Sequence, residues 1–124
     1  MMTGRRFLRA ALLALILLPG CAGLEAKPAT GLAGAWEGRS SGAGGLAPVR
    51  LVIKEDGSYQ GTFTTADDER GLHGAIMAFP SGALRWNGNL GDGSVTLLRR
   101  DGARVLRFQR DDGGGVMEIS ERAP

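Results

Sequence analysis

Cysteine and histidine are almost absent from the sequence, which contains one of each among 124 residues. A lone cysteine excludes an internal disulfide and a thiolate metal cluster, and a lone histidine excludes a histidine-rich metal site. Any histidine-based catalytic set would have to be built from His73 alone, and we expect this residue to be capped at a strand end. We therefore predict a protein that is not an enzyme and has no metal and no cofactor.

Phosphate-binding and calcium-binding motifs are also missing. The glycine-rich segment at residues 40–48 contains no Gly-Lys-Ser/Thr and precedes no helical pattern. The acidic run at residues 67–69 lacks the spaced oxygen ligands and the turn glycine of a calcium loop. We interpret this run as a solvated hairpin loop.

Long hydrophobic runs are absent, because the longest, at residues 10–18, is about half of the roughly 20 residues that a membrane-spanning helix needs. Three arginines precede this run, and the breakers Pro19 and Gly20 follow it. This order is typical of an export signal. We predict a signal-peptide helix over residues 1–20.

The only cysteine stands directly after that segment, in the sequence Leu18-Pro19-Gly20-Cys21. These residues resemble the lipobox of bacterial lipoproteins. The resemblance implies cleavage before Cys21, attachment of a diacylglyceryl group to its thiol, and an anchor in the outer membrane that faces the periplasm. The alternative is an ordinary secreted protein that is cut after Ala26 and loses Cys21.

The positive charge of the chain belongs to the export signal. The full sequence has a formal net charge of +2, but three of its 15 basic residues lie before residue 20, whereas all 13 acidic residues lie after it. The mature chain is therefore nearly neutral, and we expect no nucleic-acid partner. Residues 21–32 have the composition of a linker, which the lipobox resemblance implies is a lipidated tether, and residues 33–124 remain for one small domain.

Helical spacing is missing after residue 33, where apolar and polar residues alternate between glycine turns. The alternation predicts strands at residues 34–39, 49–54, 58–65, 73–79, 83–88, 94–100, 103–110 and 116–120. Their short connections favour an antiparallel meander, and closure would remove its exposed edges. We predict an all-β fold in which about eight short strands form a closed or nearly closed barrel.

Turn chemistry gives an expected register for each hairpin. A three-residue loop at 55–57, with Gly57 left-handed, pairs Lys54 with Ser58 and leaves Val52 as the apolar exception on the outer face. A type I′ turn at Asp101-Gly102 pairs Leu97 with Leu106. A Ser81-Gly82 turn aligns Met77 with Trp86 and Phe79 with Leu84. The expected interior comprises Trp36, Val49, Leu51, Ile53, Tyr59, Gly61, Phe63, Met77, Phe79, Leu84, Trp86, Val95, Leu97, Leu106, Phe108, Met117 and Ile119.

The same registers leave apolar residues on outward faces and bring two arginines together. The outward residues are Leu72, Ile76, Ala78, Leu98 and Val105. Arg99 lies opposite Arg104 on the inner side, where two like charges are unfavourable. Solvent at the barrel end, a carboxylate such as Asp101 or Asp111, or an anionic ligand bound by both guanidinium groups could each offset this repulsion.

The first predicted strand begins with Gly34-Ala35-Trp36, which is similar to the G-x-W signature of lipocalins and related barrels. The resemblance implies that Trp36 closes one end of the barrel.

Three classes of function remain open. The first is a lipid-anchored binding or inhibitory module that engages an envelope protein or a small anionic or apolar ligand. The second is a structural accessory subunit of an envelope complex, and the third is a hydrolase.

Overall fold

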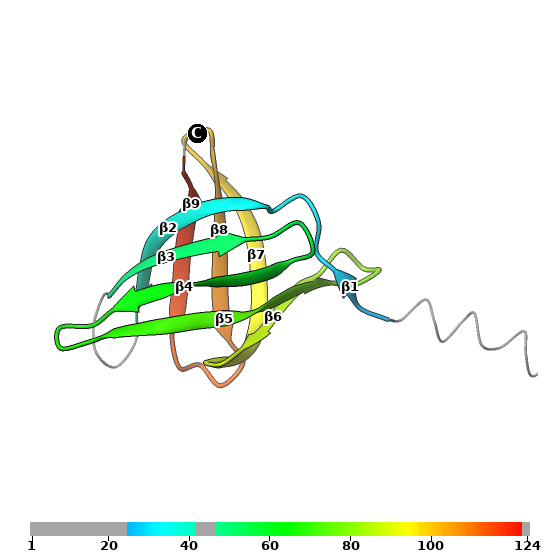
Figure 1. Ribbon diagram of the computed structural model, residues 1–124. Helices are drawn as coiled ribbons and strands as arrows, with labels where there is room; N and C mark the ends of the chain where they lie inside the picture. Colours follow the sequence, from blue (N-terminus) through cyan, green and yellow to red (C-terminus); the bar gives the residue numbers. More distant parts are fainter. Residues whose placement is uncertain (1–24, 42–46, 123–124) are drawn as a thin grey trace, which may run out of the picture.

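The computed structural model describes residues 25–41 and 47–122, and most of them lie in antiparallel strands (Figure 1). The strands are β1 (Lys27–Pro28), β2 (Gly34–Ser41), β3 (Ala47–Ile53), β4 (Ser58–Thr64), β5 (Glu69–Ala78), β6 (Leu84–Gly88), β7 (Gly91–Arg100), β8 (Ala103–Arg110) and β9 (Val116–Glu121). The expected signal peptide and Cys21 lie outside the described residues. Nowhere in residues 25–41 and 47–122 does a helix occur that is long and apolar enough to cross a bilayer.

Strands β2 to β9 form a closed eight-stranded barrel, because each pairs with the next and β9 pairs back with β2. The predicted all-β fold and the closed meander are therefore confirmed. In Figure 1, β2 to β5 run across the view and β7 to β9 run up it behind them. The first half of β5 pairs with β4 and its second half with β6. Strand β5 therefore connects the group β2 to β4 with the group β6 to β9.

Most of the predicted interior lies inside the barrel. Lys54 and Ser58 flank a three-residue loop, and Asp101 and Gly102 both have positive φ, as a type I′ turn requires. Val52 is 52% exposed on the outer face, as expected. The buried apolar cluster comprises Ala29, Leu32, Trp36, Val49, Leu51, Ile53, Tyr59, Leu72, Ile76, Trp86, Val95, Leu106, Phe108 and Ile119.

The predicted register of the β5–β6 hairpin is wrong by one residue. Phe79 and Ala83 pair around a three-residue loop, so Trp86 lies opposite Ile76 rather than opposite Met77. The loop closes like the one at 55–57, with a left-handed glycine, Gly82, at its third position. Because side chains alternate, a slip of one residue exchanges the faces of a strand.

This shift buries residues that were expected outside. Leu72 and Ile76 belong to the core, Ala78 packs against it, and His73, which alternates with them on β5, is exposed. Val105 is also buried and Leu98 is half-buried, so the expected outward apolar residues do not form an exposed strip.

Leu97 is the reverse case. It pairs with Leu106 as predicted but is 45% exposed. The pairing of β6 with β7 ends at Val95, so no residue of β6 lies beside Leu97.

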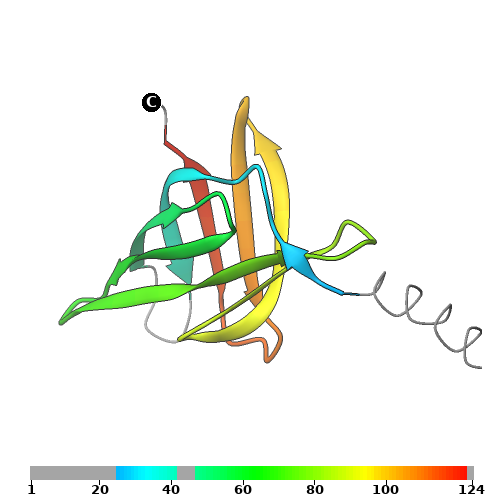
Figure 2. The same cartoon turned by 45° about the vertical axis from the view of Figure 1, so that its right-hand side comes forward.

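Part of the expected tether contributes to the fold. Strand β1 pairs with the end of β5, and Ala29 donates a backbone hydrogen bond to Ile76 at 3.0 Å. Ala29 and Leu32 are both buried in the core. The segment after β1 therefore crosses one end of the barrel and covers it (Figure 2).

Candidate functional site

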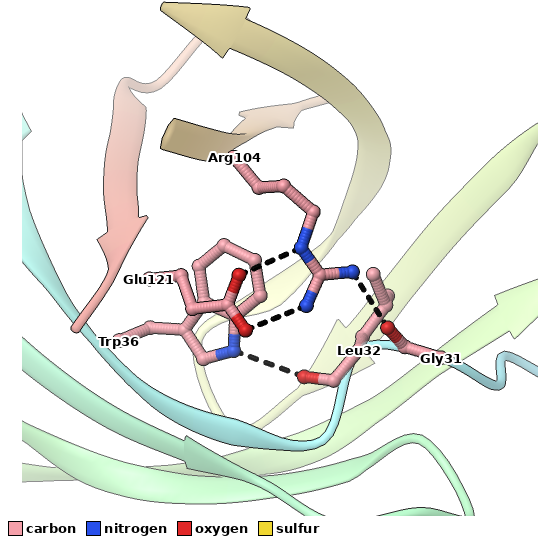
Figure 3. Close-up of polar contacts among 5 residues, drawn as sticks. All are labelled: Gly31, Leu32, Trp36, Arg104 and Glu121. Atoms are coloured by element: carbon pink, nitrogen blue, oxygen red, sulfur yellow. Dashed lines mark hydrogen bonds and ion pairs between the residues drawn. The ribbon is translucent and has the colours of Figure 1, made fainter. Parts of the chain in front are cut away.

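One end of the barrel is covered by the segment after β1, and Trp36, near the start of β2, is buried beneath this covering segment. Its side chain is 1% exposed, and its indole Nε1 donates a hydrogen bond of 2.9 Å to the backbone oxygen of Leu32. The guanidinium carbon of Arg104 lies 5.3 Å from the centre of the indole ring, within the range of a cation–π contact. Trp36 thus lies between the covering segment and an arginine of β8 (Figure 3).

The hydrogen-bond donors of the Arg104 guanidinium are occupied by other groups of the protein. Its Nε and Nη2 donate hydrogen bonds of 2.7 Å to the two carboxylate oxygens of Glu121, and its Nη1 donates to the backbone oxygen of Gly31 at 2.7 Å. This bidentate pair lowers the pKa of Glu121 below its ordinary value and raises that of Arg104. An external anion would have to displace Glu121 from these donors.

Arg99 does lie opposite Arg104 in the ladder, as expected, and the carboxylate that offsets the two charges is Glu121. Of the two carboxylates considered from the sequence, Asp111 is paired with Arg85 on another part of the barrel. Arg99 is exposed and forms no ion pair within 4.0 Å among the residues that the structure describes. The anion site at Arg99 and Arg104 stays a prediction. One of its two guanidinium groups, that of Arg104, already binds Glu121.

The opposite end of the barrel contains a cavity of about 300 Å³. Its apolar walls include Leu72, Trp86 and Phe108, and the two aromatic rings lie 6.1 Å apart. The lining includes two charged side chains, Arg70 and Arg110, and no carboxylate among the described residues. A pocket with apolar walls and a few convergent polar groups is the usual form of a small-molecule site.

The two arginines belong to the inward-facing rows of their strands. On β8 that row runs Arg104, Leu106, Phe108 and Arg110, with an arginine at each end of the interior. On β5, Arg70 precedes the buried Leu72 by two residues. Arg70 and Arg110 therefore lie where the apolar interior meets solvent, and we call this opening the mouth.

A turn after β8 holds Arg110 at the mouth. Its Nη2 donates to Asp112 Oδ2 at 2.8 Å, and Asp112 Oδ1 accepts a hydrogen bond of 2.8 Å from the backbone nitrogen of Gly114. The Gly114 bond is the main cause of the lowered pKa of Asp112, and Arg110 lowers it further. Asp112 thus stays ionised and fixes the arginine to the turn.

Tyr59 forms the inner wall of the cavity and lies over two glycines. Gly74 and Gly88 pair across β5 and β6, and a methyl group on either would lie 2.5 to 2.6 Å from the Tyr59 hydroxyl. That hydroxyl donates to the backbone oxygen of Asn87 at 3.2 Å. Burial raises the pKa of Tyr59 to about 12.

The high pKa of Tyr59 can be measured directly, because it is the only tyrosine in the sequence. We expect the tyrosinate ultraviolet absorbance to rise with a midpoint well above 10, towards about 12, in the native protein. The protonated hydroxyl favours the folded state fully below pH about 10, the unfolded pKa, and this contribution is lost between about 10 and 12. A control in denaturant should titrate near about 10. A native midpoint near 10 would contradict the buried position.

The sequence could have revealed Arg110 but not Arg70. The predicted strand 103–110 already placed Arg110 in the same row as Phe108. The predicted strand that contains His73 began four residues too late and on the wrong face, so Arg70 fell in a loop.

Neither a metal centre in the described part of the chain nor a known protein assigns a function to this barrel. Among the residues that the structure describes, no three histidine, cysteine or acidic side chains converge as metal ligands. Comparison of the chain with protein-family models, curated proteins and solved structures found no match. The function is therefore argued from the geometry of the barrel.

Proposed function

We propose that the protein is a bacterial envelope lipoprotein, anchored through Cys21, whose barrel binds one small ligand. The observation that carries the binding function is the contrast between the two barrel ends. At the Trp36 end, Arg104 and Glu121 satisfy one another and the N-terminal segment covers the interior. At the mouth, an apolar cavity of about 300 Å³ has two arginines and no carboxylate in its described lining.

The anchor and the mouth would lie at opposite ends of β5. Strand β1, which begins six residues after Cys21, pairs with β5 at Met77 and Ala78, whereas Arg70 lies eight residues earlier on that strand. At about 3.4 Å per residue the separation along β5 is up to ~27 Å. Figure 1 shows β1 and the β4–β5 turn at opposite sides of the barrel. An anchored barrel would therefore open away from the membrane, in our proposal towards the periplasm from the outer membrane.

The anchor is tested by Cys21→Ala. We expect the variant to leave the membrane fraction and to lose incorporation of labelled palmitate, since a barrel without acyl chains has no apolar anchor. Cys21→Ser is a closer steric match and should behave in the same way. Membrane retention with unchanged labelling would rule out this mode of attachment.

The binding function is tested on protein purified from its own membranes. We expect native mass spectrometry to find one small molecule bound per chain, and Leu72→Arg, which would fill the cavity with a charged side chain, to lose it. The outward apolar strip expected from the sequence would have favoured either a binding module or an accessory subunit, and it is largely buried, so it gives the accessory alternative no separate support. Recovery of one stoichiometric protein partner, with an empty cavity, would favour that alternative.

A further inference from the structure

We propose that the ligand is a small amphiphilic carboxylate, whose head is bound by Arg70 and Arg110 and whose apolar body enters the cavity between Trp86 and Phe108. This inference rests on the proposed binding function and specifies its ligand class. The proposed site lies at the opposite end of the barrel from the predicted anion site at Arg99 and Arg104.

The size of the cavity limits the ligand. A volume of about 300 Å³ is at the lower end of small-molecule sites. At ~30 Å³ for each water-sized group, it holds on the order of ten such groups. The apolar body is therefore a short acyl chain or a single ring, and two full-length acyl chains of a membrane lipid would not fit.

The charge of the mouth selects the head group. Arg110 makes a single ion pair, through Nη2 to Asp112, and its Nε and Nη1 make no hydrogen bond to another described residue. Arg70 has a distant contact of 4.0 Å with Asp68, and 65% of its side chain is exposed. Each guanidinium thus keeps donors in a planar fork, which suits a carboxylate better than a neutral hydroxyl.

The closed end of the same barrel contains an arginine that already binds a carboxylate. Arg104 occupies the equivalent position at the other end of the inward row of β8 and binds both oxygens of a carboxylate beside an indole ring. At the mouth, Arg110 lies beyond Phe108 with Trp86 nearby, and no side-chain carboxylate of the described lining enters the cavity. A ligand carboxylate would supply the group that Glu121 supplies at the closed end.

The test compares octanoate with octanol by titration calorimetry at fixed salt, because the two share an apolar chain and differ in the head. We expect the wild-type protein to bind octanoate about tenfold to a hundredfold more tightly, as expected for hydrogen bonds to a charged group. Arg70→Gln combined with Arg110→Gln should remove this preference while octanol still binds. Arg50→Gln, which removes an exposed arginine of β3 away from the cavity, should keep the preference.

The outcomes separate the two proposals. Equal binding of octanoate and octanol, or a preference that survives in the double variant, would overturn the carboxylate inference and leave the binding module standing. Binding of neither compound to the wild-type protein would overturn the carboxylate inference, and an empty protein in native mass spectrometry would then also remove the binding function. Octanol binding to the double variant shows that its cavity is intact.

Discussion

Replacement of Trp36 by alanine should lower the free energy of unfolding by about 3–5 kcal/mol, the range for a large buried aromatic side chain. The indole is 1% exposed, donates to Leu32 and lies under the Arg104 guanidinium. Its removal would leave a cavity at the closed end and an unpaired backbone oxygen in the covering segment. For a domain of this size each kcal/mol lowers the melting temperature by ~4–8 °C, so thermal unfolding would show a large shift.

Two variants control this experiment. Trp36→Phe keeps most of the ring but loses the hydrogen bond to Leu32, so its loss of stability should be smaller than that of Trp36→Ala. Val52→Thr changes a side chain that is 52% exposed on the neighbouring strand and should stay within about 0.5 kcal/mol of wild type. If Trp36→Ala were as stable as Val52→Thr, Trp36 would not close the barrel.

Replacement of Gly74 by alanine should destabilise the wall of the cavity by about 1–3 kcal/mol, the usual range for overpacking. A methyl group there would lie 2.0 Å from the backbone oxygen of Asn87 and 2.5 Å from the Tyr59 hydroxyl. Since the Asn87 oxygen belongs to the backbone, β6 must move, and the Tyr59 hydroxyl must move as well. Denaturant unfolding measures the loss, and the pKa of Tyr59 should fall from about 12 towards its ordinary value if its ring is displaced.

Gly71 is the matched control for Gly74, because it lies on the same strand and an added methyl group would meet nothing within 4 Å. Gly71→Ala should leave both stability and the Tyr59 titration close to wild type. Equal effects of the two substitutions would mean that Gly74 is not needed for the close approach of Tyr59.

Local turn chemistry predicted most of the barrel. The loop at 55–57 and the Asp101-Gly102 turn gave the correct strand pairing of two hairpins. In each of them, the position of the left-handed glycine determines the length of the loop and therefore the register of the two strands. The same signal was available at Gly82, but the predicted two-residue turn at Ser81-Gly82 placed Pro80 opposite Ala83. Counting Pro80–Gly82 as three loop residues gives the observed pairing of Ile76 with Trp86.

The closed end was less predictable because it depends on contacts between distant strands. Trp36 is opposite Glu121 only because β9 returns to β2, and the predicted last strand stopped one residue short of that carboxylate. The burial of Ala29 and Leu32 likewise arises from the barrel beneath them, since their local sequence has the composition of a linker. At the mouth, the alternation on β5 identifies Arg70 only after the register is known.

The central claim is that the barrel binds its ligand at one end, and the two tryptophans provide the most direct test. The sequence contains two indole N–H groups, Trp86 in the cavity wall and Trp36 at the closed end. In a nitrogen-15 NMR titration with octanoate, we expect the Trp86 indole signal to shift with saturation while the Trp36 signal stays in place. A shift of Trp36 without Trp86 would contradict the account. No shift of either signal would overturn the carboxylate inference and leave the binding function to native mass spectrometry.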